Sequence, residues 1–205
     1  MSDSHPDEPN SFRNRLLRNE VSWKTFYGFL LSVLMAICGL VFINAVQVYV
    51  IIDILSYPRE NLGFATGSLA FADELLCVPM VTLWGFISDR YGRQIIMAIG
   101  LAIMALSISL YPWASCVFPS NFANIFSSLL FFRLLFAVGG SASTSMITAL
   151  IGDIALEGGR SKVAGFVGIA AGFGALSAAL LFARLPLLFS RNVMKLSLRL
   201  DQILS

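Results

Sequence analysis

Charged residues are scarce in this sequence of 205 residues: they make up 13% of the chain, against about 25% in an average soluble domain. Hydrophobic residues account for 57%, and the mean hydropathy is +0.79. A water-soluble globular domain does not have this composition. The scarcity of charge therefore predicts an integral membrane protein.

The patterns that hold metals, cofactors or nucleic acids are also missing. The single histidine is His5, and the three cysteines, Cys38, Cys77 and Cys116, stand far apart inside apolar runs. Zinc enzymes need His or Cys ligands at close spacing, and membrane phosphotransferases need clustered acids for metal ions. The sequence also has no P-loop, dinucleotide fingerprint or nucleophile elbow, and its net charge is only +2. We expect no metal, no cofactor and no nucleic-acid partner, and an enzyme is the disfavoured alternative.

Five apolar runs are long enough to cross a bilayer, which takes about 20 helical residues. The predicted spans are Phe26 to Ile52, Phe64 to Ile87, Gln94 to Tyr111, Ile125 to Ile151 and Val163 to Leu185. Turn-forming or charged residues separate these runs. The predicted fold class is therefore all-α, a polytopic bundle of five transmembrane helices.

Lysine and arginine residues are distributed unevenly between the predicted loops. Eight lie before the first span and in the second and fourth loops, one lies in the first loop, and the third loop has none. Cytoplasmic loops are enriched in these residues. We predict a multi-pass protein with a cytoplasmic N-terminus, in the plasma membrane or an internal membrane.

The two ends of the chain differ from its apolar middle. Residues 1–24 begin with acids and prolines and continue with basic residues, which indicates a disordered cytoplasmic N-terminus with a basic juxtamembrane collar. Residues 25–186 form the predicted bundle. Residues 187–205 mix basic and apolar residues, and we expect an amphipathic or atypical tail. Either this tail rests on the membrane surface, or the chain is the front part of a larger protein whose ending has been lost or replaced.

The second predicted loop gathers charge between two apolar runs. Residues 85–94 read GFISDRYGRQ, and they include Gly85, Asp89, Arg90, Gly92 and Arg93. This segment resembles the signature loop of the major facilitator superfamily of secondary transporters, whose pattern runs roughly Gly-x-Leu-x-Asp-Arg-x-Gly-Arg-Lys. Ile87 and Gln94 depart from that pattern.

Weaker similarities to the same family follow later in the chain. Arg133 and Gly139 match the ends of its Arg-x-x-Gln-Gly-x-Gly motif, although the Gln-Gly pair is absent. Asp153 and Arg160, at the cytoplasmic ends of the fourth and fifth spans, resemble an acid and an arginine around the family's fourth loop. The glycine-rich fifth span is similar to the antiporter motif but lacks its Gly-Pro pair, which weakens any prediction of antiport. The resemblance implies an incomplete N-terminal six-helix bundle, with five of twelve spans.

The charged loop also has a physical interpretation that does not depend on the resemblance to the family. Gly85 and Gly92 permit a tight reversal of the chain, and Asp89 can interact with the amides that begin the third span. Arg90 and Arg93 satisfy the cytoplasmic bias for positive charge. Two interpretations stay open: an orientation signal with a helix cap or, as the resemblance implies, a latch between two halves of a transporter.

Polar residues inside three of the spans are the candidate site. Asn44, Asp73 and Arg133 lie about 13 to 15 Å from the outer ends of their spans, near the midplane, with Glu74 one residue deeper. A charge in the bilayer is costly and needs a partner. We expect Arg133 to pair with Asp73 or Glu74 and to line a solute or ion pathway with Asn44 and Gln47. The alternative is an ion pair that only fixes helix packing.

Small residues form two further patterns, one in each of the last two spans. Gly139 to Ser145 contains only Gly, Ser, Ala and Thr, and Gly168 and Gly172 have the small-xxx-small spacing. Such patterns let helix backbones approach closely. We predict helix packing at both places, with helix bending during transport as the alternative.

These patterns predict transport of a small solute by alternating access. The expected partners are the solute, with a proton as a candidate coupling ion, and the lipid bilayer. Alternating access rocks two bundles around a central site, so we expect five spans to be a truncated form that transports only with a second copy or a full-length relative. The alternative is a non-transporting scaffold or a regulatory fragment of a full-length transporter.

Overall fold

The structure, a computed structural model, describes residues 17–18, 21–49, 51–52, 62–110 and 122–181. This part contains five helices that are long and apolar enough to cross a membrane. They are α2 (Trp23–Tyr49), α3 (Leu62–Tyr91), α4 (Arg93–Leu110), α6 (Phe122–Ile154) and a last helix, Arg160–Leu181. Each overlaps one predicted span, so the prediction of an all-α transmembrane bundle is confirmed.

The ends of the helices differ from the predicted spans by a few residues. The largest extension at the basic ends is in α3, which continues past Ile87 through Ser88, Asp89 and Arg90 to Tyr91. An α-helix satisfies its backbone hydrogen bonds internally, so polar residues can prolong it beyond the apolar run. The apolar runs therefore give the positions of the spans but not their last turn.

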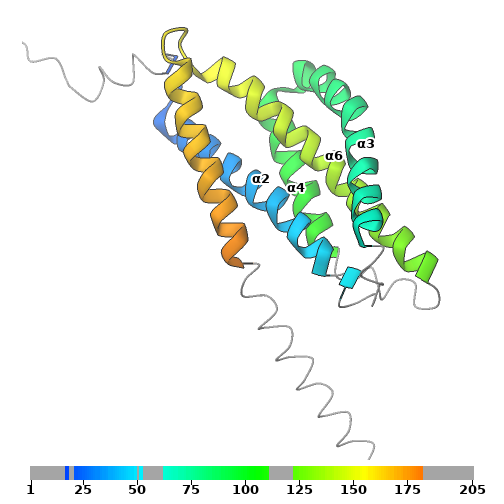
Figure 1. The fold of residues 1–205 in the computed structure, drawn as a ribbon. Coiled ribbons are helices and arrows are strands. Elements are labelled where there is room, and N and C mark those ends of the chain that lie inside the picture. The colour runs from blue at the N-terminus through cyan, green and yellow to red at the C-terminus, as the bar shows by residue number, and fades with distance from the viewer. Residues whose placement is uncertain (1–16, 19–20, 50, 53–61, 111–121, 182–205) are drawn as a thin grey trace, which may run out of the picture.

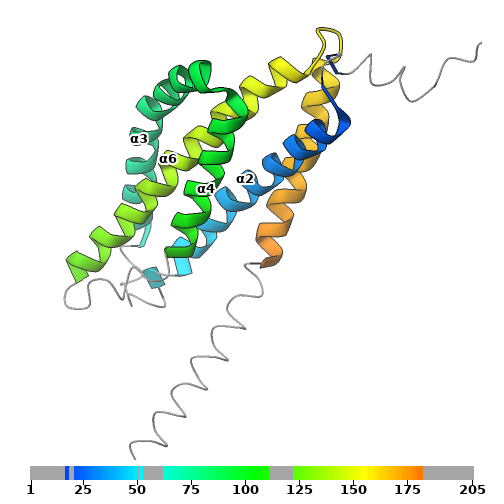
Figure 2. The same cartoon turned by 180° about the vertical axis from the view of Figure 1, so that it is seen from behind.

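Helix α6 is the centre of the bundle. It packs most extensively against α4 and then against α3, and it also contacts α2. In Figure 1, α3 and the last helix lie on opposite sides of the bundle, and Figure 2 shows the same order from behind. The helices that carry the predicted polar residues, α2, α3 and α6, thus belong to one packed unit.

Glycines bring helix backbones close together at two places. A Cβ atom added at Gly139 of α6 would lie 2.7 Å from the Gly100 carbonyl oxygen of α4, and one added at Gly174 would lie 2.5 Å from the Leu34 carbonyl oxygen. The last helix therefore packs on α2 through Gly174. Gly168 and Gly172 have nothing within 4 Å of an added Cβ, so the close contact of this helix is displaced from the predicted pair.

A single residue, Gly92, separates α3 from α4. Its φ of 98° lies in the left-handed region, which favours glycine, and its amide donates to the Ser88 carbonyl 2.9 Å away. Gly85 lies inside α3, so the predicted contribution of Gly85 to the reversal is wrong. We call this end of the bundle the Gly92 end.

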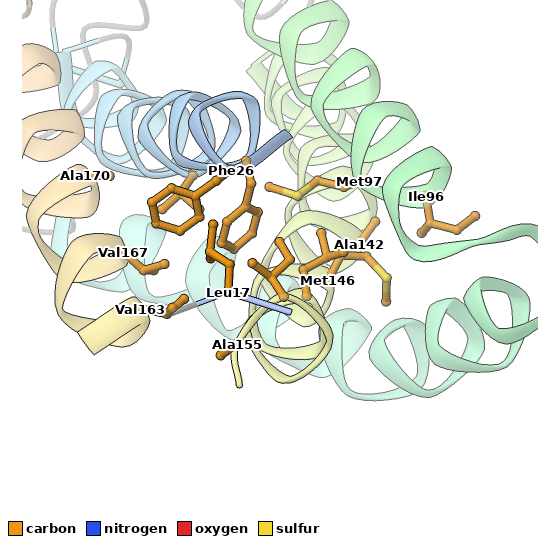
Figure 3. Close-up of a cluster of buried hydrophobic side chains, with 14 residues drawn as sticks. Leu17, Phe26, Ile96, Met97, Ala142, Met146, Ala155, Val163, Val167 and Ala170 are labelled. Carbon is orange, nitrogen blue, oxygen red and sulfur yellow. The ribbon is translucent and has the colours of Figure 1, made fainter. Parts of the chain in front are cut away.

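A cluster of buried apolar residues fills the bundle toward the Gly92 end (Figure 3). Leu17 is fully buried in it beside Ala155 and Val163. The Arg18 amide also donates to the Ile154 carbonyl at 3.1 Å. Part of the predicted disordered N-terminus is thus held against the end of α6, whereas residues 1–16 and 19–20 lie outside the described residues, as does the predicted tail at 187–205.

Candidate functional site

A polar cavity of about 410 Å³ lies between α2, α3 and α6. On α3, the lining positions 70, 73, 74, 77 and 81 fall on one face of the helix. On α6, positions 133, 136, 137, 140, 141 and 144 do the same, and α2 contributes Leu40 and Asn44. The helical repeat of three spans therefore brings their polar side chains to one place.

Arg133 links the three helices around this cavity. Its Nε donates to Asp73 Oδ2 on α3, and its Nη2 donates to Asn44 Oδ1 on α2 at 2.7 Å. Arg133 is only 4% exposed and Asp73 only 8%. Each of the three residues lies well inside its helix, and the group is nearer to the end opposite Gly92 than to the Gly92 end.

Two charged atoms of this ion pair remain without a partner. Arg133 Nη1 and Asp73 Oδ1 are buried and make no hydrogen bond within the described residues. Buried polar atoms in proteins are nearly always paired, with protein, water or ligand. The pair therefore holds one free donor and one free acceptor in residues that line a cavity.

The structure separates the other two predicted residues of this layer. Glu74 lines the cavity but is exposed, and the ion pairs among the described residues do not include it. Successive helical residues point about 100° apart. Asp73 therefore meets Arg133, while the neighbouring Glu74 lies on an exposed part of α3. Gln47 is buried outside the cavity lining, and its Oε1 has no hydrogen-bond partner in the part of the chain that the structure describes.

A second charged group lies at the Gly92 end. Arg93 Nη1 donates to Asp153 Oδ1 at 2.8 Å and to the Ala149 carbonyl at 3.0 Å, which ties the start of α4 to the end of α6. Asp89 Oδ1 lies 3.9 Å from Arg93 Nη2. Arg90 and Arg160 are exposed. The predicted residues of the charged loop and of the fourth loop thus meet in one pair, Arg93 with Asp153.

No group of three or more histidine, cysteine or acidic residues suited to a metal ion occurs among the residues that the structure describes. In the polar cavity, the acids Asp73 and Glu74 are accompanied only by Cys77 from this set. The donor set does not fit a metal centre, because Asp73 is already paired with Arg133.

A family model described as Major Facilitator Superfamily matches residues 29–190. The chain belongs to the Major Facilitator Superfamily. Proteins of this superfamily are secondary transporters, not enzymes. The matched segment contains both charged groups, the Arg133 cavity and the Arg93–Asp153 pair.

Among curated proteins, this member of the superfamily is similar to Protein spinster of Drosophila melanogaster. The two are 23% identical over 133 residues, which is 62% of this chain and 20% of the relative. The chain therefore spans about a fifth of the length of the curated relative that it matches. No solved structure matches the chain.

Three further polar residues that line the cavity were not predicted as site residues from the sequence. Cys77 lies one turn after Asp73 on α3, and its Sγ donates to the Ala137 carbonyl at 3.8 Å. Ser141 and Thr144 lie two to three turns after Arg133 on α6. The signal was available, because i+4, i+8 and i+11 positions share a helix face with residue i. The Ser and Thr residues were attributed to helix packing alone.

Proposed function

We propose that this chain forms part of an alternating-access transporter of small solutes, with the cavity around Arg133 on the solute pathway. The observation that carries the proposal is the ion pair of Arg133 and Asp73 beside a cavity inside the spans of a superfamily member. Ionisable residues inside a membrane are costly and mark substrate or ion pathways. Binding sites of secondary transporters lie inside the membrane between helices.

The residues around the ion pair support a binding role in addition to a structural one. A purely structural pair is stabilised when its remaining polar atoms are hydrogen-bonded. Here neither Arg133 Nη1 nor Asp73 Oδ1 has a hydrogen-bond partner among the described residues. An occupant of the cavity that bonds to these two atoms would stabilise the pair further.

The Arg93–Asp153 pair is proposed as a latch at the Gly92 end, which we place in the cytoplasm. Asp153 and Arg93 are both partly exposed, so the pair can open at little cost, because exposed ion pairs contribute only about 0–1 kcal/mol. Opening it would release this side-chain contact between the start of α4 and the end of α6, which stay packed along their length. Such a pair is suited to a contact that forms and breaks during a transport cycle.

Alternating access needs a second bundle opposite the first. The described residues form one bundle, so the proposed cycle requires helices from outside the described residues, from a second copy, or from a related transporter. Plasma and internal membranes both stay open as locations.

The test compares wild type with Arg133→Ala in the transport-competent protein. Mass spectrometry of cells and medium identifies solutes whose distribution changes when wild-type protein is expressed. We expect Arg133→Ala to abolish these changes while the variant still fractionates with membranes. Lys162→Ala, which removes an exposed cation far from the cavity, should keep them.

Two outcomes would contradict the proposal. If expression of the Arg133→Ala variant produced the same solute changes as wild type, Arg133 would not lie on the pathway. If the wild type inserts into the membrane but changes no solute, alone or together with a related transporter, a non-transporting scaffold is favoured.

A further inference from the structure

The polar cavity carries an excess of negative charge. Its lining includes two acids, Asp73 and Glu74, and one base, Arg133. Arg133 is paired with Asp73, so the charge of Glu74 is not offset by any ion pair among the described residues. A carboxylate inside a span, lining a cavity, is expected to have a partner. The candidates are a bound cation and a proton.

Hydrogen-bonding capacity in the cavity is also one-sided, because most of its donors are already used. Asn44 Nδ2 donates to the Leu40 carbonyl at 2.8 Å, and the hydroxyls of Ser141 and Thr144 donate to the Val138 and Gly140 carbonyls, both at 2.9 Å. The Cys77 thiol donates to the Ala137 carbonyl. These contacts consume hydrogens and leave lone pairs.

The free groups are therefore mainly acceptors. They are the Glu74 carboxylate, the buried Asp73 Oδ1, and the hydroxyl oxygens of Ser141 and Thr144, which keep lone pairs after donating. Arg133 Nη1 is a buried donor without a hydrogen-bond partner among the described residues, and Asn44 Nδ2 and Arg133 Nη2 each keep one further N–H. The Phe136 ring also lines the cavity, and the Arg133 guanidinium lies over it, 6.0 Å from the ring centroid.

We propose that the cavity binds a small solute that carries an ammonium group, with Glu74 as its charge partner. The positive charge of the ammonium group lies against the Glu74 carboxylate and the neighbouring acceptor oxygens, and a hydroxyl or carbonyl oxygen of the same solute accepts from Arg133 Nη1. The cavity volume of about 410 Å³ suits a small molecule. This inference rests on the proposed function and names the chemical class of its solute.

The test measures ligand-induced thermal stabilisation of the full chain, purified in detergent micelles. The probes are choline, its neutral isostere 3,3-dimethylbutan-1-ol and the anion 3,3-dimethylbutanoate, which have similar shape and differ in charge. A ligand that binds only the folded state raises Tm in a saturable way. We expect choline to raise Tm and the neutral and anionic probes to leave it unchanged.

Two variants locate the effect. Glu74→Gln should weaken the choline response by about tenfold or more, because it removes the negative charge that pairs with the cation. Glu157→Gln removes an exposed acid beyond the end of α6 and should leave the response unchanged. Reading the response relative to each variant's own Tm without ligand separates binding from folding.

Stabilisation by the anion or equally by the neutral probe would overturn the inference, as would a full choline response in Glu74→Gln. No response to any probe would also overturn it for this class of solute. These results leave the proposed function intact if Arg133→Ala still abolishes the solute changes. Conversely, choline binding that depends on Glu74 without any transport would refute only the proposed function.

Discussion

Arg133 and Asp73 lie 60 residues apart in the sequence and form an ion pair that joins α6 to α3 inside the bundle. The guanidinium also reaches Asn44 on α2. One side chain therefore sets the relative positions of three helices and, at the same time, the shape of the cavity between them.

Asp73→Asn should lower the free energy of unfolding by about 3–5 kcal/mol, because it leaves the buried Arg133 without a counter-charge. Circular dichroism during unfolding in mixed micelles measures the loss. The double variant Asp73→Asn/Arg133→Gln should recover part of it, since neither partner is then charged. Losses that simply add in the double variant would show that the two residues are not coupled.

Gly92→Ala should destabilise the protein by about 1–2 kcal/mol, because alanine at a φ of 98° is strained. The matched control is Gly85→Ala in the same sequence motif. Gly85 lies inside α3 with nothing within 4 Å of an added Cβ, and alanine there should stabilise the helix by about 0.5–1 kcal/mol. Thermal unfolding in micelles gives both values, and equal effects at the two glycines would contradict the turn geometry.

Gly139→Ala should cost about 1–3 kcal/mol by forcing α6 away from α4, since the new Cβ would lie 2.7 Å from the Gly100 carbonyl oxygen. Gly168→Ala serves as the control, because an added Cβ there meets nothing within 4 Å. Tm measured for both variants tests the difference. A Gly139→Ala variant as stable as Gly168→Ala would show that the two helices are not in such close contact.

The orientation can be tested with single cysteines in a background without Cys38, Cys77 and Cys116. A membrane-impermeant maleimide should label Arg90→Cys, at the Gly92 end, only after cells are permeabilised, because basic loops remain in the cytoplasm. Gly63→Cys, at the other end of α3, should be labelled in intact cells. The reverse pattern of labelling would contradict a cytoplasmic Gly92 end.

The spans could be predicted from the sequence because a bilayer imposes a minimum length on each apolar run. Counting residues from the ends of the spans also predicted that Asn44, Asp73 and Arg133 lie at a similar depth in the membrane. The count gives the height along a helix but not the direction in which a side chain points. Gln47 therefore appeared beside Asn44 in the prediction, whereas the structure places it outside the cavity lining.

The contacts between helices could not be predicted in the same way. Arg93 binds Asp153 because α4 packs against α6. The sequence of each helix does not indicate which other helix it packs against. Close packing at Gly139 was predicted, but its partner Gly100 on α4 was not, for the same reason. Motif spacing identifies residues that matter within one helix, and packing decides which helix they meet.

The position of Leu17 also bears on how this protein can be shortened or tagged. A chain that begins at Trp23 would keep all five spans. It would still lose the Leu17 side chain, which packs between the end of α6 and the start of the last helix. An N-terminal fusion partner should join the chain well before residue 17, so that the packing of Leu17 is kept.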